Sequence, residues 1–275
     1  MKLNRREFLT TTIAAAAVPV LPLSALPGDS GPIKLSVATY SLRSFKRPEA
    51  IKMIQQLQIK FADVKDFHLS LKDSPEQLKA GVKEFHDAGI KIVAGGNITL
   101  KKPEQLRPAF EYAKACGMAV IVCAPAKEQL PAIEKLVQEF NIKIAIHNHG
   151  PEDAAFFPTP KSALDAVKGM DPRMGLCIDI GHTARTGADV VESIEEAGPR
   201  LYELHTKDLK DKTANESQVA VGEGVLPIPE IFRQLAKQKY SGYCSLEYEI
   251  NAKDPLPGMQ KSFDYMRKVI SEMRA

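Results

Sequence analysis

The sequence predicts a single (β/α)8 barrel over residues 33–275. Short apolar runs alternate with longer amphipathic segments at roughly even spacing. A nearly continuous apolar run is typical of a parallel strand that is buried on both faces. The roughly 240 residues involved match the size of one such barrel. A doubly wound open sheet is the alternative, but the stretch 94–97 lacks the GxGxxG pattern of a phosphate-binding loop.

Eight segments have the composition of buried strands. They are rich in Val, Ile, Leu and Ala, and turn residues or amphipathic stretches separate them. The predicted strands cover residues 34–40, 61–67, 90–96, 118–124, 142–148, 175–181, 201–207 and 242–249.

The intervening segments carry the start and stop signals of helices. In the clearest one, Ser74 is the predicted N-cap, Pro75 stands in the first turn and Gly89 follows the last turn. Helices of the same plan are predicted over residues 102–117, 128–141 and 227–242. Strands and helices therefore alternate along the chain, as βα units require.

Charge and cysteine usage exclude several classes of protein. The formal net charge is +3, and the basic residues are scattered among acidic ones, so no nucleic-acid or membrane-surface partner is expected. The four cysteines lie in or beside apolar runs without paired spacing, so they are predicted to be core residues, with one disulfide as the alternative. They are Cys116, Cys123, Cys177 and Cys244. Assembly into a homo-oligomer is left open.

The N-terminal residues are predicted to be an export signal. Residues 1–25 run from basic residues through an Ala, Val and Leu stretch to small residues, which is the layout of a signal peptide. The Arg5 and Arg6 pair resembles the twin-arginine motif. The chain is therefore expected to use the twin-arginine export machinery and to reach the periplasm without a stable membrane anchor. A short anchor that stays attached is the alternative.

Polar residues that can bind ligands follow five of the predicted strands. In a (β/α)8 barrel the carboxyl ends of the strands surround one mouth, where active sites lie. Five of the six histidines fall in this set. In strand order the residues are Lys65, Asp66 and His68, then His147, Asn148 and His149, then Asp179 and His182, then His205, Lys207 and Asp208, and finally Glu247 and Glu249.

Four of these residues, one at the end of each of the last four strands, are predicted to bind a metal ion. His147, Asp179, His205 and Glu247 offer two nitrogens and two carboxylates. Such a set can surround one divalent ion and leave positions open for substrate oxygens. The His147-x-His149 pair alone is weak evidence, because strand-end histidines are commonly satisfied by hydrogen bonds. Its combination with ligands on three further strands favours a metal site.

Four segments carry a resemblance to a known family. They are "GLCIDIGHTARTG", "LYELHTKDLK", "VGEGVLPIPEIFRQL" and "YSGYCSLEYE". In order and spacing they resemble the xylose isomerase-like TIM-barrel family, which includes sugar isomerases, ketose 3-epimerases, inosose dehydratases and endonuclease IV enzymes. The most specific motifs are Asp-x-Gly-His at 179–182, His-x-Lys-Asp at 205–208 and Glu-x-Glu at 247–249. The resemblance extends over essentially everything from Ile33 onward and implies a TIM barrel.

The resemblance also implies the ligand set of a divalent ion. Isomerases and epimerases of this family bind their metal through Glu, Asp, His and Glu, and the last three correspond to Asp179, His205 and Glu247. His147 stands where the family has its first Glu, so either His147 or the nearby Glu152 is expected as the fourth ligand. Imidazole in place of a carboxylate favours Mn²⁺, Co²⁺ or Zn²⁺ over Mg²⁺, which prefers oxygen ligands.

The expected function is that of a divalent-metal-dependent sugar isomerase or epimerase. The enzyme would act through an enediolate on a small-molecule sugar substrate: a ketose, a cyclitol or a keto-sugar. Expulsion of a neighbouring oxygen would instead make it a keto-glycoside lyase or dehydratase, which is the main alternative. An endonuclease IV-like phosphodiesterase is a weaker alternative, since the chain has few histidines and no basic stripe. A noncatalytic sugar-binding protein is another, and it would retain the barrel without bound metal or turnover.

Individual roles follow for the remaining polar residues. The candidates for proton transfer are Glu152, Glu247, His182 and Lys207. The candidates for substrate binding are Lys65, His68, His149 and Arg185. In the alternative interpretation, Lys207 and Asp208 form an ion pair with each other and Arg185 is a solvated loop charge.

Overall fold

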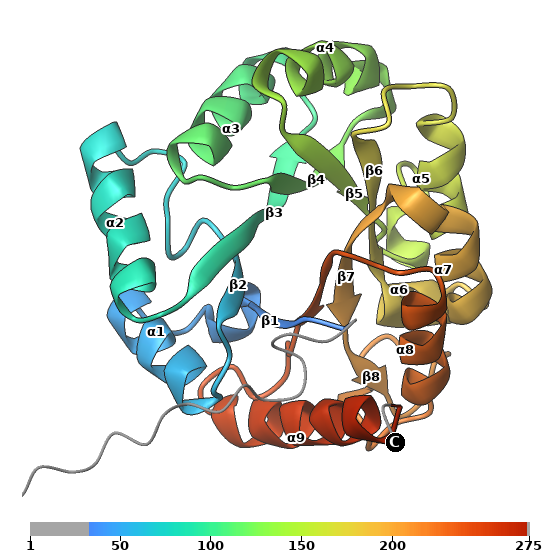
Figure 1. The fold of residues 1–275 in the computed structure, drawn as a ribbon. Coiled ribbons are helices and arrows are strands. Elements are labelled where there is room, and N and C mark those ends of the chain that lie inside the picture. The colour runs from blue at the N-terminus through green and yellow to red at the C-terminus, as the bar shows by residue number, and fades with distance from the viewer. Residues whose placement is uncertain (1–32, 274–275) are drawn as a thin grey trace, which may run out of the picture.

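The protein folds into a closed barrel of parallel strands surrounded by helices (Figure 1). This computed structural model describes residues 33–273. The predicted TIM barrel is therefore confirmed, whereas the predicted signal peptide of residues 1–25 lies outside the described residues and stays a prediction. No helix within 33–273 is both long enough and apolar enough to cross a membrane.

All eight barrel strands coincide with predicted ones. Each pairs in parallel with its two neighbours, in the order β1-β10-β7-β6-β5-β4-β3-β2. The last strand carries the label β10 because β8 (Asp208–Leu209) and β9 (Gln218–Val219) form a separate antiparallel pair, which the sequence did not predict. The barrel strands are β1 (Leu35–Ala38), β2 (Phe61–Val64), β3 (Lys91–Leu100), β4 (Val120–Pro125), β5 (Lys143–His147), β6 (Met174–Asp179), β7 (Leu201–Thr206) and β10 (Tyr243–Leu246).

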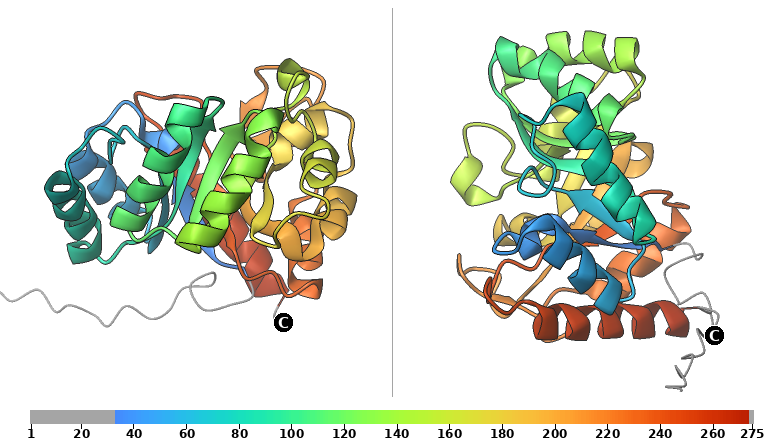
Figure 2. Two further views of the ribbon diagram at one scale, coloured as in Figure 1. Left: turned by 90° about the horizontal axis from the view of Figure 1, so that it is seen from above. Right: turned by 90° about the vertical axis from the view of Figure 1, so that its left-hand side faces the viewer.

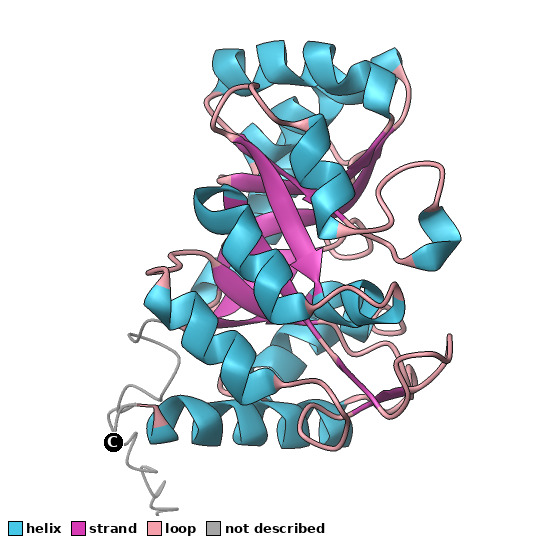
Figure 3. Ribbon diagram, turned by 90° about the vertical axis from the view of Figure 1, so that its right-hand side faces the viewer, coloured by secondary structure: helices cyan, strands magenta, loops and turns pink. Residues whose placement is uncertain are grey.

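The α-helices lie on the outside of the barrel and cover the strands (Figures 2 and 3). They are α1 (Arg47–Gln56), α2 (Pro75–Asp87), α3 (Pro103–Ala115), α4 (Leu130–Phe140), α5 (Pro160–Ala166), α6 (Ile180–Arg185), α7 (Val190–Ala197), α8 (Ile228–Lys237) and α9 (Leu256–Glu272). Single 3-10 turns are η1 (Thr39–Leu42), η2 (Lys127–Gln129), η3 (Pro151–Asp153) and η4 (Gly198–Arg200).

Local signals explain where the helices begin and end. The side chain of Ser74 accepts a hydrogen bond from the Gln77 backbone N–H at 3.3 Å, so the predicted N-cap of α2 is confirmed. Helix α4 ends at Asn141, which adopts the left-handed conformation with φ of 53°. These signals set the βα register, and the register determines which strand residues reach the mouth of the barrel.

Two apolar clusters hold the barrel together. The larger one lies between strands and helices and includes the fully buried rings of Phe85, Phe110, Phe232 and Phe263. The smaller one consists of strand residues with small side chains: Ala94, Val122, Ala145 and Cys177. Ala145 and Cys177 each lie two residues before a site residue, His147 and Asp179, on the same strand. They therefore face the same side of the strand as these site residues. All four cysteines are buried and free, which confirms their prediction as core residues.

Asp208 organises the loop that follows the seventh barrel strand. Its carboxylate accepts hydrogen bonds from the backbone N–H groups of Gly222, Gly224 and Leu226 at 2.9, 3.1 and 3.1 Å. A Cβ at Gly224 would lie 2.1 Å from Asp208 Oδ1, so only glycine fits there. The alternative ion pair between Lys207 and Asp208 is therefore wrong, because the carboxylate of Asp208 is committed to this loop.

Candidate active site

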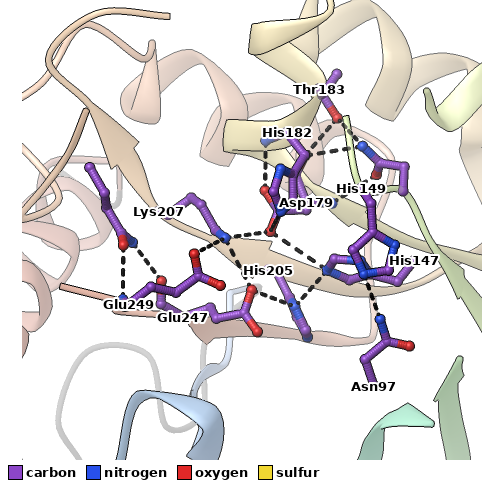
Figure 4. A network of polar contacts seen from close by, with 12 residues as sticks. Asn97, His147, His149, Asp179, His182, Thr183, His205, Lys207, Glu247 and Glu249 are labelled. Atoms are coloured by element: carbon purple, nitrogen blue, oxygen red, sulfur yellow. Dashed lines mark hydrogen bonds and ion pairs between the residues drawn. The ribbon is translucent and has the colours of Figure 1, made fainter. Parts of the chain in front are cut away.

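The four predicted metal ligands converge at the mouth of the barrel (Figure 4). His147, Asp179, His205 and Glu247 come from the ends of β5, β6, β7 and β10, and each offers one ligand atom within 4.8 Å of the others. All four residues are buried, with Glu247 the most exposed at 7%. Four sequence positions that are up to a hundred residues apart thus form one cluster, called the ligand cluster below.

The distances within the ligand cluster suit a divalent ion. His147 Nε2 lies 3.6 Å from Asp179 Oδ2 and 3.1 Å from His205 Nδ1. His205 Nδ1 lies 3.3 Å from Glu247 Oε2. Adjacent ligand atoms that bind one ion at about 2.1 Å are roughly 3.0–3.4 Å apart. The distances from His205 Nδ1 to His147 and Glu247 fall in this range and the His147–Asp179 distance lies just above it, so the cluster and its donor chemistry fit a divalent ion.

Asp179 is oriented by the start of helix α6. Its Oδ1 accepts a hydrogen bond from the His182 backbone N–H at 2.8 Å, which makes Asp179 the N-cap of that helix. The backbone N–H of Asp179 donates to Asn148 Oδ1 at 3.0 Å, and Asn148 Nδ2 donates to Thr183 Oγ1 at 3.1 Å. With Oδ1 used as the cap, Oδ2 points into the ligand cluster.

His205 is held by a carboxylate from the opposite side of the barrel. Its Nε2 lies 3.1 Å from Oδ2 of Asp63, a buried residue of β2. A proton on Nε2 that is donated to Asp63 leaves the lone pair of Nδ1 for the ligand cluster. A carboxylate behind a ligating histidine is a recurring arrangement in metal sites.

Lys207 places a positive charge next to the ligand cluster. Its Nζ lies 2.9 Å from Asp179 Oδ2, 3.1 Å from Glu247 Oε2 and 3.5 Å from Glu249 Oε2 (Figure 4). Gly181 makes this approach possible, because a Cβ there would lie 2.6 Å from two carbons of the Lys207 side chain. The approach of Lys207 therefore explains why the Asp-x-Gly-His motif has glycine at this position.

The charges in this cluster shift the pKa values of its members. Burial lowers the pKa of His147 to about 4, so this imidazole is neutral at pH 7. Burial alone would raise the pKa values of Asp179 and Glu247, but Lys207 and neighbouring imidazoles hold both well below their usual range. Burial alone would lower the pKa of His205, but Cys177 and the carboxylates of Glu247 and Asp63 raise this pKa well above its ordinary value.

A cavity of about 250 Å³ opens directly above the ligand cluster and is called the inner cavity. On one side it is lined by Glu247 and Glu249, which belong to the segment after β10. On the other side it is lined by His149 and His182. The lining is completed by His147 of the ligand cluster and by Tyr40, Lys65 and Asn97. Carboxylates and imidazoles therefore face one another across a space next to the ligand cluster.

His149 and His182 are neutral bases in this cavity. Burial is the main cause that lowers both of their pKa values to about 4. Asn97 Nδ2 lies 2.8 Å from His149 Nε2, so it can donate to the unprotonated nitrogen. Lys65 donates to the backbone oxygen of Asn97 at 2.6 Å. The structure thus places His149, His182 and Lys65 where the sequence predicted pocket residues.

Glu152 and Arg185 lie farther out. They form an ion pair with each other, and Arg185 NH1 approaches His182 Nδ1 at 3.4 Å. The side chain of Arg185 is 9% exposed, so it is not a solvated loop charge, whereas that of Glu152 is 48% exposed. Of the two residues expected as fourth ligand, the structure places His147 in the ligand cluster and Glu152 outside it.

The expectation that His68 binds substrate needs correction. Its side chain is 1% exposed and is absent from the lining of the inner cavity. Its Nε2 lies 3.1 Å from the backbone oxygen of Phe45. The ring therefore joins the segments after β1 and β2 instead of facing the inner cavity.

Three residues at the site were missed by the analysis of the sequence: Asp63, Asn97 and Tyr40. Asp63 carried a usable signal, since it is a charged residue within an apolar run, and such a residue requires a partner when buried. Asn97 and Tyr40 are ordinary polar residues near strand ends. Their role depends on which loops meet over the mouth, and a single sequence does not contain this information.

The comparison with known proteins identifies the family. Residues 55–269 match the family described as the xylose isomerase-like TIM barrel. The chain belongs to this family. The resemblance carried by the four sequence segments is thereby confirmed. Epimerases and dehydratases are among the enzymes related to this family.

Relatives of the chain in this family include a dehydratase. The inosose dehydratase of Mesomycoplasma hyopneumoniae strain 7448 is 26% identical over 156 residues, which cover 50% of this chain and 51% of the dehydratase. The chain spans about half the length of the curated relatives it matches. The similarity therefore supports common descent without fixing the reaction.

Solved structures share the fold over most of the chain. The IOLI protein, solved with a zinc atom, gives a TM-score of 0.72 at 17% identity and covers 87% of this chain and 99% of its own. A D-psicose 3-epimerase solved with D-fructose gives a TM-score of 0.66 at 16% identity, with coverages of 88% and 98%. At these identities the likeness shows the fold alone.

Proposed function

We propose that the protein is a divalent-metal-dependent isomerase or epimerase of a ketose, cyclitol or keto-sugar. The observation that carries this proposal is the position of the ligand cluster directly below a cavity with carboxylates on one wall and neutral imidazoles on the other. The family membership and the epimerase and dehydratase relatives support the same chemistry.

His147, Asp179, His205 and Glu247 would hold the ion. A divalent ion there supplies Lewis acidity, which stabilises the negative charge that develops on a sugar carbonyl when the neighbouring carbon loses a proton. The donor set contains two imidazoles, so we expect Mn²⁺, Co²⁺ or Zn²⁺ rather than Mg²⁺. Lys207, whose pKa is raised by three carboxylates despite its burial, contributes a fixed positive charge rather than a base.

Proton transfer is assigned to the two walls of the inner cavity. Glu247 and Glu249 on one wall can remove a proton from the substrate carbon. The pKa of Glu249 is raised, mainly by burial, which makes this carboxylate the stronger base of the two. The proton removed by the carboxylate passes to solvent, and His182 or His149 on the opposite wall takes a proton from water and delivers it to the other face or to the adjacent carbon.

Elimination is the second candidate reaction. It is favoured by one observation: at the end of β5 a neutral imidazole, His147, occupies the place where the family's isomerases have a carboxylate. The carboxylates of Glu247 and Glu249 face the substrate from one wall of the inner cavity. The imidazoles of His149 and His182 on the other wall are placed to assist a departing oxygen. The similarity to inosose dehydratase points the same way.

Metal content is the first test. Elemental analysis should find about one divalent ion per wild-type chain and a loss of that equivalent in Asp179→Ala. Asp254→Ala, which changes an exposed aspartate outside the ligand cluster, is the matched control and should retain the ion. Equal metal content in wild type and Asp179→Ala would refute the site.

The reaction is tested with metal-loaded enzyme in D₂O. Ketohexoses, inososes and 3-keto-glycosides are incubated with wild type, and the products are followed by NMR. Solvent deuterium at the carbon beside the carbonyl supports isomerisation or epimerisation, and an unsaturated sugar supports elimination. Turnover with neither outcome would overturn the proposal and favour a hydrolytic use of the ion.

A further inference from the structure

A second and larger cavity adjoins the inner cavity. It measures about 490 Å³ and is called the outer cavity. Asn97, His149 and His182 line both cavities, so the two spaces meet at these residues. The outer cavity extends over the ends of β3 and β4 toward η3 and the loop that contains Asn215.

The sizes of the two cavities indicate how large the substrate is. Small-molecule sites usually measure about 300–1,000 Å³. At about 250 Å³ the inner cavity lies below this range and accommodates a single sugar ring. A substrate of one ring would leave the outer cavity unused, whereas a substrate with two rings would fill both.

The lining of the outer cavity suits a ligand rich in hydroxyl groups. Its polar side chains carry both signs of charge and neutral amides, including Lys101, Glu152, Arg185 and Asn215. A phosphate would meet the carboxylates of Glu152 and Asp153, and an apolar group would bury these charges without partners. Hydroxyl groups both donate and accept, so they match such a mixed surface.

Arg185 is the residue best placed to bind this part of the substrate. Its side chain is nine-tenths buried and lines the outer cavity, next to His182, which lines both cavities. The contacts with Glu152 and His182 use part of its five N–H donors, and the rest are available for ligand oxygens. Because Arg185 also touches His182, a group bound in the outer cavity would position a wall of the inner one.

We propose that the outer cavity is a second sugar subsite, so that the substrate is a glycoside in which a carbonyl-bearing ring is linked to a second hydroxylated ring. This inference rests on the proposed function for the identity of the reacting ring. It assigns the Glu152 and Arg185 pair to binding of the second ring rather than to proton transfer.

Two probes and two variants test the subsite. Methyl 3-keto-β-glucoside is the one-ring probe, and cellobiose oxidised to the ketone at C3 of its non-reducing ring is the two-ring probe. Ala124→Phe places a large side chain in the outer cavity. Ala236→Phe makes the same change in a separate cavity of about 410 Å³ between α8 and α9 and serves as the control.

Binding is measured by saturation-transfer NMR, which needs no turnover. In wild type and in Ala236→Phe, protons of the second ring should receive saturation, and in Ala124→Phe they should lose it. The ratio of kcat/KM for the two-ring over the one-ring probe should be about tenfold in wild type and fall to near one in Ala124→Phe. If Ala124→Phe fails to fold, Asn215→Trp from the exposed loop takes its place.

The outcomes separate the two proposals. Second-ring saturation that persists in Ala124→Phe, or that never occurs in wild type, overturns the subsite. Turnover of both probes at equal efficiency also overturns it and leaves the proposed reaction standing. Saturation of the second ring without turnover of either probe supports the subsite and refutes the reaction.

Discussion

The two ring nitrogens of His205 have different partners, and this difference decides how the residue can act. Nε2 faces Asp63, and Nδ1 faces the other members of the ligand cluster. A carboxylate in this position fixes the ring orientation and increases the basicity of the ligating nitrogen. Asp63 is therefore a positioning residue for the proposed metal site.

The first prediction concerns this carboxylate. Asp63→Asn keeps the size of the side chain but removes its charge, so Zn²⁺ or Co²⁺ affinity should fall by about 10–100-fold. Competition with a chelator measures the affinity, and the Co²⁺ absorption spectrum should shift because ligand basicity changes. Asp87→Asn on the exposed surface of α2 is the control. Unchanged affinity and spectrum in Asp63→Asn would contradict the role.

The second prediction concerns pH. The pKa of His205 is raised above its ordinary value near 6.5, so the metal-free imidazole is protonated at neutral pH, and an ion must displace this proton. His147, with a pKa of about 4, adds no proton at neutral pH. Affinity should therefore rise by about tenfold per pH unit between pH 6 and 7. Calorimetry in buffers of different ionisation enthalpy should detect release of about one proton, and a pH-independent affinity would contradict the assignment.

At this scale the sequence reveals the ligands but not their supports. His147, Asp179, His205 and Glu247 were predictable because each one follows or closes an apolar run. The charge of Asp63 within an apolar run indicates only that it needs a buried partner; that partner, His205, lies 142 residues away and meets it only when the barrel closes. The outward position of Glu152 depends on the path of the loop after β5, which has no local pattern.

Among the elements, helix α6 has the largest influence on the site. It begins after its N-cap Asp179, a member of the ligand cluster, places His182 on the wall of the inner cavity and ends at Arg185 in the lining of the outer cavity. Gly181 in its first turn makes room for Lys207. A helix of six residues thus connects the ligand cluster with both cavities.

The third prediction concerns Gly181. Gly181→Ala inserts a methyl group 2.6 Å from buried carbons of Lys207, and such overpacking should lower the free energy of unfolding by about 1–3 kcal/mol. The displaced ammonium should also weaken metal binding. Gly187→Ala is the control for metal binding: its φ of +81° strains the backbone of any alanine, but no atom lies within 4 Å of the added Cβ, so stability should fall without a change in metal affinity. Denaturant unfolding and metal titration measure both effects, and equal metal affinity in the two variants would contradict the steric role.

The predictability of an element depended on its local signals. Helix α2 was predictable from Ser74, Pro75 and Gly89, which act within the helix itself. Helix α6 was not predicted, because six residues are too few to show helical periodicity and its N-cap was interpreted as a strand-end ligand. The β8 and β9 pair was missed because strands of two residues leave no alternation.

For the whole molecule, the strand order fixes one mouth and thereby one site. The closed order brings β1 beside β10, so residues from both ends of the described chain line the same cavity. This arrangement was predictable in outline, because eight βα units have one common closed solution. The shape of the mouth was not, because it depends on loops that connect strands with helices.

The fourth prediction concerns the location of the protein. We propose that the chain is exported in folded form by the twin-arginine machinery, on the basis of Arg5, Arg6 and the apolar run after them. Replacing both arginines with lysine should leave the precursor in the cytoplasm, as fractionation and immunoblotting would show. Lys2→Arg is the control. Secretion that continues unchanged in the double variant would reject this route.

The position of Lys207 has a consequence for how the proposed metal site would be filled. Two buried carboxylates face an ammonium that belongs to the chain itself, so their repulsion is offset before any ion arrives. The barrel can then complete its folding in the apo form, in contrast to small zinc domains, whose folding depends on the metal. Folding and metal loading become separate events. The ion supply of the compartment in which loading takes place, rather than the order of intrinsic affinities alone, would then select which metal the proposed site carries.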